Sequence, residues 1–296
     1  MREKITAGKI WGIVYPVLLY TGITIIIGNL IAMVLMVMVM VTGDASSRET
    51  IENTVYSALN SQVMMMTLCS ALATLPFLVF FMHRDIQREK LNNRFIKYER
   101  VSFFKYLLII PFGIFGMLSA NYFVSILTLI MPKFMTESYT DTAQYIYGSQ
   151  LVVQVIAAGI ICPIVEELIF RGLVYKRLKK ISSVMVAGII SSLLFGIYHG
   201  NWVQAPYAFI VGMLCVYVYE KYKSIVAPIL FHMSANMLSV LVTALVGQTA
   251  AEQSGASVPL MQQLMACTFM TVVTGVLAFA MALIIKKTVN PKEIKV

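Results

Sequence analysis

The sequence predicts an all-α protein, a polytopic membrane bundle of about eight transmembrane helices with both termini in the cytoplasm. Of the 296 residues, 59% are apolar and only 12% are charged, and the mean hydropathy is +0.80. No ordinary soluble domain has this composition. The apolar residues gather in runs of about 20, the length of a spanning helix, and backbone amides in lipid must be satisfied internally. These runs favour helices over the short alternating strands of a membrane barrel.

Eight apolar runs follow one another along the chain. They cover approximately residues 10–41, 61–82, 104–131, 150–175, 182–199, 204–219, 225–247 and 259–285. The first run follows a basic start but is far longer than a cleavable signal peptide, so we expect a retained helix that is tilted or broken near Pro16. The sixth run would form only about 22 Å of helix. We therefore expect the turn before it, around residues 199–204, to be recessed within the membrane.

Basic residues alternate from loop to loop, and this alternation predicts the topology. Of the 23 Lys and Arg residues, 21 lie in five groups, at 2–9, 84–105, 171–180, 221–223 and 286–295, which precede the first run or adjoin the ends of the second, fourth, sixth and eighth. The other two, Arg48 and Lys133, lie in the opposite set of loops. The positive-inside rule places the basic set, including the stretch 83–102, in the cytoplasm of a multi-pass protein of the cell membrane. The net charge of +9 therefore needs no nucleic-acid partner.

Polar stretches divide the chain into four parts. Residues 1–105 hold two helices and the basic loop, 106–149 a third helix and an extracytoplasmic loop, 150–247 four helices, and 248–296 the last helix with a basic tail. The extracytoplasmic loops 42–60 and 132–149 are too short to be soluble domains, so function must reside in the bundle or at its cytoplasmic rim. All four cysteines lie in apolar runs without CxxC spacing, which favours packing over disulfides or a zinc knuckle.

Ionisable side chains inside spanning segments are costly and mark candidate functional sites. The first, second, third, sixth and eighth runs carry none between their ends. The fourth run carries Glu166, Glu167 and Arg171, the fifth carries His199, and the seventh carries His232. The chemistry is therefore expected in the second half of the bundle.

Helical spacing separates the two glutamates. Adjacent side chains on a helix point about 100° apart. Arg171 lies four residues after Glu167, the favourable order for an ion pair, which leaves Glu166 available. His232 and Asn236 are also four residues apart, so they present an imidazole and a carboxamide on one helix face.

Depth brings most of these groups to one level. At 1.5 Å per residue from the cytoplasmic ends, Glu166 lies about 14 Å deep, and His232 and Asn236 about 10 to 16 Å deep. By the same count His199 lies at a depth of about 26 Å, which is too deep to meet Glu166 unless its helix tilts or begins as a surface segment. We expect Glu166, His199, His232 and Asn236 to line one cavity.

Three segments in this part of the chain carry a family resemblance. EELIFR at 166–171, FGIYH at 195–199 and HMSAN at 232–236 resemble the EExxxR, FxxxH and HxxxN motifs of the CAAX prenyl protease and bacteriocin-processing family of intramembrane glutamic endopeptidases. The resemblance covers about residues 150–240, and the other helices are compatible with that family in number only. It implies that residues 150–247 form a catalytic core.

The resemblance also implies roles for these residues. Glu166 and His199 would activate a water that hydrolyses a peptide bond, His232 and Asn236 would stabilise the oxyanion, and Glu167 with Arg171 would form a supporting ion pair. The mechanism implies no cofactor. The implied substrate is a membrane-associated, lipidated or leader-bearing peptide or protein, reached from the lipid bilayer.

Other functions remain open. A non-catalytic protein of the same fold, such as a bacteriocin-immunity or scaffold protein, would keep the helices. Glu166, His199 and His232 are also the residue types of a zinc protease site, although HxxxN places an amide where another strong ligand would be expected. A transporter with Glu166 as proton relay would call for inverted repeats and broken helices, which the sequence does not display. Neither GxSxG nor HExxH occurs.

Overall fold

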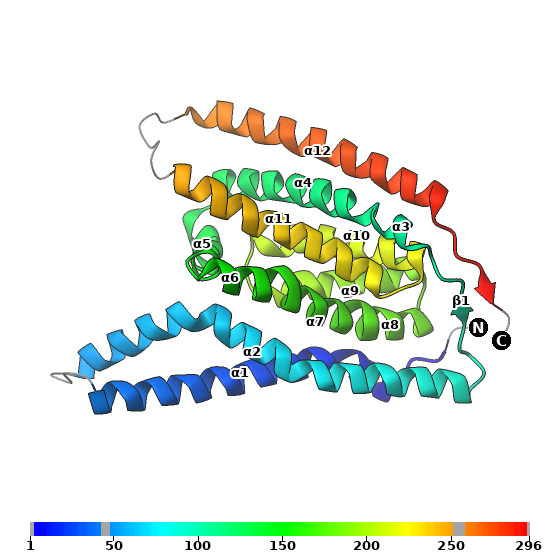
Figure 1. Ribbon diagram of the computed structural model, residues 1–296, viewed down its shortest axis with the longest axis horizontal. Helices are drawn as coiled ribbons and strands as arrows, with labels where there is room; N and C mark the ends of the chain where they lie inside the picture. The colour runs from blue at the N-terminus through cyan, green and yellow to red at the C-terminus, as the bar shows by residue number, and fades with distance from the viewer. Residues whose placement is uncertain (1–2, 43–47, 251–257, 295–296) are drawn as a thin grey trace.

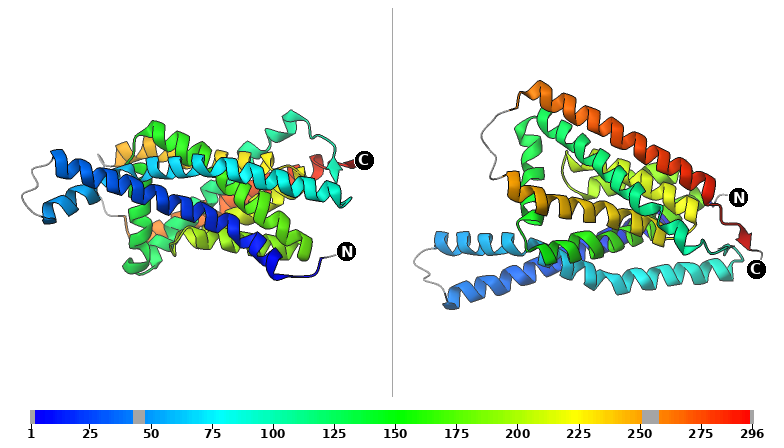
Figure 2. Two further views of the ribbon diagram at one scale, coloured as in Figure 1. Left: turned by 90° about the horizontal axis from the view of Figure 1, so that it is seen from below. Right: turned by 45° about the horizontal axis from the view of Figure 1, so that its top comes forward.

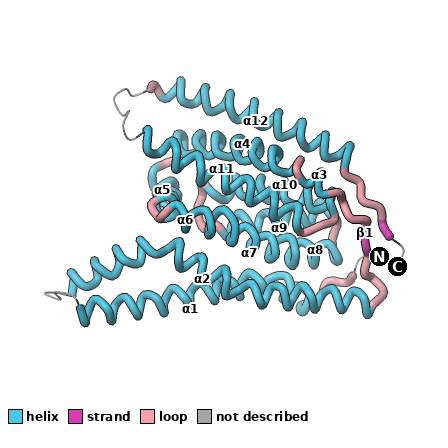
Figure 3. Tube along the Cα trace, in the orientation of Figure 1, coloured by secondary structure: helices cyan, strands magenta, loops and turns pink. Residues whose placement is uncertain are grey.

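The structure is a computed structural model that describes residues 3–42, 48–250 and 258–294. Within these ranges every element is helical except two strands of two residues each (Figures 1 and 3). Six helices are long and apolar enough to cross a membrane, namely Ala7–Val41, Ser61–Leu91, Phe103–Ile130, Leu151–Ile181, Val226–Leu245 and Leu260–Thr288. The expected all-helical, multi-pass membrane architecture is confirmed at this level.

The helices follow the eight predicted apolar runs. In chain order they are α1 (Ala7–Thr42), α2 (Arg48–Leu91), α3 (Phe103–Tyr106), α4 (Ile109–Ile130), α5 (Lys133–Tyr147), α6 (Leu151–Gln154), α7 (Cys162–Glu167), α8 (Lys176–Ile181), α9 (Val184–Tyr198), α10 (Gln204–Tyr222), α11 (Val226–Ala250) and α12 (Leu260–Thr288), with π-helical segments η1 (Val155–Ile161) and η2 (Leu168–Tyr175). The chain from α6 to α8 forms one 31-residue rod. π-Helical geometry is often found at functional sites, and here η1 precedes the motif that begins at Glu166 and η2 contains its last four residues.

Both predicted extracytoplasmic loops are largely helical where the structure describes them. Residues 48–60 begin α2, and 133–147 form α5, while 43–47 lie outside the described residues. These segments are too polar to be recognised as spanning helices. A helix at a bundle end needs only a few apolar contacts, and Tyr139 of α5 supplies one against the small cluster around Val203.

The first helix is continuous through Pro16. A proline has no N–H, so the carbonyl of Gly12, four residues earlier, loses its helical donor. The Arg177 guanidinium of α8 donates to that carbonyl instead. This contact from another helix replaces the missing bond and removes the need for a break. At 36 residues and about 54 Å, α1 exceeds a hydrocarbon core of about 30 Å, which favours tilt.

The bundle has two packed halves. α1 and α2 run beside the rod α6–α8, whereas α12 lies against α4 on the opposite side, with α9, α10 and α11 between them (Figures 1 and 2). One buried cluster joins α7, η2 and α9 to α1 and α2, and a second joins α4, α10, α11 and α12. Residues 3–9 and 288–294 lie at the same end of the bundle (Figure 1).

A short antiparallel pairing ties the end of the chain to the segment after α2. Strand β1 (Lys97–Tyr98) pairs with β2 (Glu293–Ile294) in the register Lys97 to Ile294 and Tyr98 to Glu293. Hydropathy carries no signal for two-residue strands. This pairing places the basic tail beside the basic loop.

Candidate active site

The six residues singled out from the sequence come from four helical segments. Glu166 and Glu167 end α7 and Arg171 lies in η2, His199 follows the last residue of α9, and His232 and Asn236 lie on α11. α7 packs directly on α11, and α9 packs on η2. The bundle therefore joins three motifs that are up to 70 residues apart.

Glu167 and Arg171 form a fully buried ion pair. Arg171 Nη1 donates to Glu167 Oε1 over 2.7 Å, and both side chains are completely buried. The i, i+4 spacing predicted this pair. The same Glu167 oxygen also lies 2.9 Å from His232 Nδ1, a contact that spacing along one helix could not reveal. His232 is therefore fixed to the ion pair.

Glu166 lies on the other side of the His232 ring. Its Oε2 is 3.7 Å from His232 Nε2, which is too long for a hydrogen bond but short enough for both groups to contact one oxygen atom between them. The Glu166 side chain is 15% exposed, whereas Glu167 is fully buried. The two adjacent carboxylates thus differ as the spacing predicted, yet one imidazole contacts both.

His199 is held at the end of α9 by its own helix. Its Nδ1 lies 2.8 Å from the carbonyl oxygen of Phe195, so the tautomer that donates there leaves Nε2 as an acceptor. The Phe195 ring packs edge-on against both imidazoles, with centroid distances of 4.7 Å to His199 and 5.7 Å to His232. It also lies 4.8 Å from the guanidinium carbon of Arg171. Phe195 therefore sets the spacing of the two histidines.

Asn236 is engaged with the rod. Its Nδ2 donates to the carbonyl oxygen of Ala158 in η1 over 3.0 Å. A carboxamide carries two N–H donors, so one of them is not used by this bond. Asn236 thus fixes α11 to η1 and keeps one donor for another acceptor.

Several neighbours of the site gave little or no sequence signal. Tyr20 of α1 is 3% exposed and stacks on Tyr198 with ring centroids 5.8 Å apart. Both phenols and the Cys162 thiol lie near enough to Glu166 for its charge to act on them. Tyr198 stands inside the FGIYH segment, but Tyr20 is more than 140 residues from Glu166 in the sequence. Only the packing of α1 on η2 brings it here.

A set of potential metal ligands also lies at this site. In the described part of the chain, Glu167, Cys215 and His232 are the group of three whose donor atoms lie within 4.8 Å of one another. These are not the three residues considered from the sequence, Glu166, His199 and His232. Glu167 Oε1 already faces the Arg171 guanidinium and the His232 ring, and a divalent cation would meet a buried positive charge there. The donor set therefore fits a resident zinc ion poorly.

Comparisons with known proteins find a family match over the region that contains the three motifs. The family model "Type II CAAX prenyl endopeptidase Rce1-like" matches residues 148–238. The chain is 31% identical to UPF0177 protein YxdF of Lactococcus lactis over 128 residues, 42% of this chain and 70% of that protein. No solved structure matches it.

Two further relatives carry peptidase names. "Putative membrane peptidase YdiL" of Bacillus subtilis is 32% identical over 87 residues, 29% of this chain and 36% of that protein. "Membrane-embedded CAAX protease MroQ" of Staphylococcus aureus is 23% identical over 142 residues, 45% of this chain and 58% of that protein. The chain thus spans about a third and somewhat over half of these two relatives, and all three matches are confined to part of it.

Proposed function

Since this chain belongs to the CAAX-protease-like family of membrane peptidases, we propose that it is an intramembrane endopeptidase using a water molecule activated by Glu166 and His199. The 3.7 Å approach of the Glu166 carboxylate to His232 Nε2, beside the buried pair of Glu167 and Arg171, carries the proposal. Hydrolysis of an amide needs a proton acceptor and donors aimed at the developing oxyanion. The site holds both kinds of group.

The roles follow from the contacts of each side chain. Glu166 is the carboxylate without an arginine partner in the described contacts, so it accepts the proton of the attacking water and returns it to the amine nitrogen as the C–N bond breaks. His199 assists through Nε2, because its Nδ1 is occupied by Phe195. When both of its ring nitrogens carry protons, His232 donates to Glu167 through Nδ1 and to the oxyanion through Nε2, and the remaining N–H of Asn236 is a second oxyanion donor. Glu167 with Arg171 orients His232 as a carboxylate orients a catalytic imidazole.

The substrate is a peptide or protein held at the membrane, lipidated or bearing a leader. The site lies among helices that are apolar enough to span the bilayer, which favours a scissile bond close to the membrane. We place the catalytic core at residues 150–247. The remaining helices belong to the parts 1–105, 106–149 and 248–296.

The proposal includes eight crossings. α9 and α10 would cross together with the six longer helices, and an even number of crossings places both termini on one side, which agrees with their common end in Figure 1. The basic loops make that side the cytoplasm.

A comparison of membrane-proximal peptides tests the activity. Cells producing the wild-type chain should lack full-length substrate peptides that accumulate in cells producing Glu166→Gln, because glutamine cannot accept the proton. Glu137→Gln, an exposed glutamate of α5, is the matched control and should behave as wild type. Identical peptide sets for wild type and Glu166→Gln at equal protein levels would instead favour the non-catalytic scaffold or immunity function.

Metal analysis of the active protein separates the water mechanism from a zinc protease. We expect the purified protein to keep its activity after treatment with a chelator. Stoichiometric zinc, with activity removed by the chelator and restored by zinc alone, would show that Glu166 has been given the wrong role.

A further inference from the structure

A second polar site lies at the end of the bundle that holds both termini. A cavity of about 1540 Å³ opens there between α1, α2, α8, the end of α10 and β1. None of the six candidate active-site residues lines it. Eleven Lys and Arg side chains and five carboxylates line this basic cavity, an excess of six positive charges.

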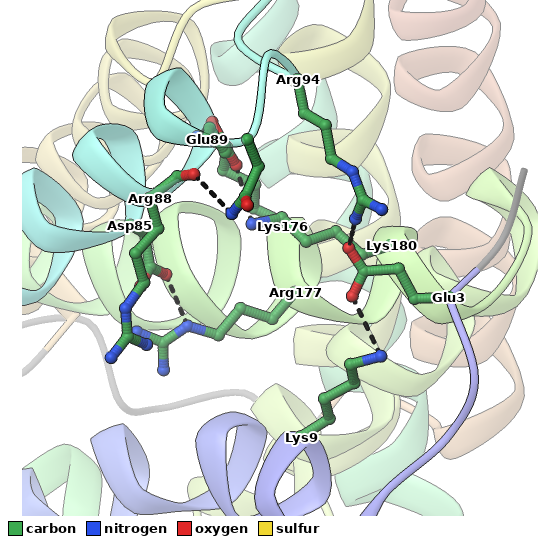
Figure 4. Close-up of polar contacts among 10 residues, drawn as sticks. Glu3, Lys9, Asp85, Arg88, Glu89, Arg94, Lys176, Arg177 and Lys180 are labelled. Carbon is green, nitrogen blue, oxygen red and sulfur yellow. Dashed lines mark hydrogen bonds and ion pairs between the residues drawn. The ribbon is translucent and has the colours of Figure 1, made fainter.

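Three of the five carboxylates in the basic cavity are each shared between two cations. Figure 4 shows Glu3 between Lys9 and Arg94, and Glu89 near Lys176 and Lys180. In the same way Glu220 bridges two further lysines. One carboxylate neutralises only one of its two partners. The ion pairs therefore position the cations without cancelling their charge.

Two arginines converge on one phenol at the cavity wall. Arg84 Nη2 and Arg177 Nη2 each donate to Tyr15 Oη over 2.9 Å. Arg177 is neutralised by Asp85 over 2.7 Å. Arg84 has no carboxylate within ion-pair distance among the described residues, and its Nε is buried without a hydrogen-bond partner. Its guanidinium is held over the Phe81 ring, at 5.2 Å from the centroid. This fixed guanidinium lacks a counter-charge.

The cavity wall continues onto an apolar surface of α1. Trp11 and Leu18 of α1 line the cavity, and their side chains are 60% and 51% exposed. A ligand that meets both regions carries an anion at one end and hydrocarbon at the other. A phosphate diester with acyl chains has this chemistry, and anionic headgroups are attracted to basic segments at the membrane surface.

We propose that the basic cavity binds the phosphate of an anionic phospholipid, with Arg84 as the central cation and the acyl chains along Trp11 and Leu18. The inference concerns a site separate from the candidate active site and does not rest on proteolysis. Phosphate accepts bidentate hydrogen bonds from a planar guanidinium, which suits the held orientation of Arg84. Bound lipid joins α1 and α2 to α8.

Trp11 provides a direct probe. The chain has two tryptophans, and replacing the exposed Trp202 by phenylalanine leaves Trp11 as the single tryptophan, which can be excited apart from the tyrosines. The full chain is placed in nanodiscs in which a small, equal fraction of either phosphatidylglycerol or phosphatidylcholine is brominated. We expect brominated phosphatidylglycerol to quench Trp11 more strongly than brominated phosphatidylcholine.

Variants link this preference to the cavity. Arg84→Gln should lower the occupancy by phosphatidylglycerol roughly fivefold, as expected for loss of one cation near a lipid phosphate. Arg88 is an exposed residue of the same wall, and Arg88→Gln should also lower the occupancy by phosphatidylglycerol. This second variant keeps the test valid if Arg84→Gln does not fold. Lys286→Gln, an exposed cation outside the cavity, is the matched control and should leave the preference unchanged.

Three outcomes would overturn the proposal. Equal quenching by both lipids in the wild type means that no headgroup is selected. Loss of the preference on adding inorganic phosphate, but not sodium chloride at the same ionic strength, assigns the site to free phosphate. Absence of a lipid preference together with Arg84-dependent binding of a soluble polyglutamate peptide assigns it to an acidic peptide segment.

Discussion

His232 lies between two carboxylates whose surroundings differ. Glu167 is fully buried, and its Oε1 contacts both Arg171 and His232 Nδ1, whereas Glu166 keeps a small exposed fraction and faces His232 Nε2. When both ring nitrogens carry protons, one donates to Glu167 and the other points toward Glu166 and any oxygen beside it. Glu167 therefore orients the His232 ring, and Glu166 remains free to take part in the reaction.

Glu167→Gln tests this division of roles. The change leaves the buried Arg171 guanidinium uncompensated, which costs about 3–5 kcal/mol of stability for a buried pair. We expect a clearly lower unfolding temperature in detergent and a lower turnover, whereas Glu166→Gln should lose turnover and keep its unfolding temperature. A Glu167→Gln protein as stable as wild type would contradict the supporting role of the pair.

At the scale of elements, close helix contacts depend on a few glycines. α4 approaches α11 at Gly113, where an added Cβ would lie 2.7 Å from the carbonyl oxygen of Phe231 and would clash with the side chain of Ser234. A backbone oxygen cannot rotate away as a side chain can. This pair of helices therefore packs at a distance that only glycine permits.

Gly113→Ala should destabilise the protein by roughly 1–3 kcal/mol, the usual cost of overpacking. Gly22→Ala on α1 is the matched control, because a Cβ there meets nothing within 4 Å. Unfolding of both variants in detergent gives the comparison. Equal unfolding midpoints for the two alanine variants would mean that α4 and α11 can separate freely at this contact.

The polar end of α10 is joined to α8 by a pH-sensitive contact. Burial raises the pKa of Glu220, but hydrogen bonds from Lys179 and Lys223 outweigh this effect, so the pKa lies below its ordinary value of 4.5. A carboxyl whose pKa is lower in the folded state contributes stability above its ordinary pKa and loses it as the pH falls through the folded value.

Glu220→Gln should therefore lower the unfolding temperature near neutral pH, and the difference from wild type should shrink below a pH of about 4.5. Thermal unfolding of the wild type and Glu220→Gln over a series of pH values measures the difference in unfolding temperature. Glu137→Gln controls for loss of an acidic charge elsewhere. A difference that stays constant on acidification would show that Glu220 is not held in its charged form by the two lysines.

At the scale of the whole molecule, both termini and the basic cavity share one end. The pairing of β1 with β2 and the bond from the Glu3 amide to the Lys180 carbonyl hold the chain ends there. Charge is strongly asymmetric between the two ends of the bundle, which is what the positive-inside rule requires of a fixed orientation.

Cysteine labelling in intact cells tests this orientation. In a background without native cysteines, Arg88→Cys should react with an impermeant maleimide only after the cells are opened, because it lies in the last turn of α2 within the basic stretch 83–102. Lys133→Cys at the start of α5 should react from outside. Labelling of position 88 in sealed cells would reverse the topology.

The sequence by itself determined the membrane environment, the positions of the six long apolar helices and the pair of Glu167 with Arg171. Hydropathy and i, i+4 spacing act over one or two turns, so a single segment contains them. Only the tertiary structure decided that His232 contacts both glutamates and that Tyr20 and Cys215 lie beside them. It also decided that Arg177 donates to the Gly12 carbonyl, whose helical donor is missing because of Pro16. Helices far apart in sequence make these contacts. Which side chains meet depends on how the helices pack, because polar groups removed from lipid and water must find partners on whatever helix lies next to them.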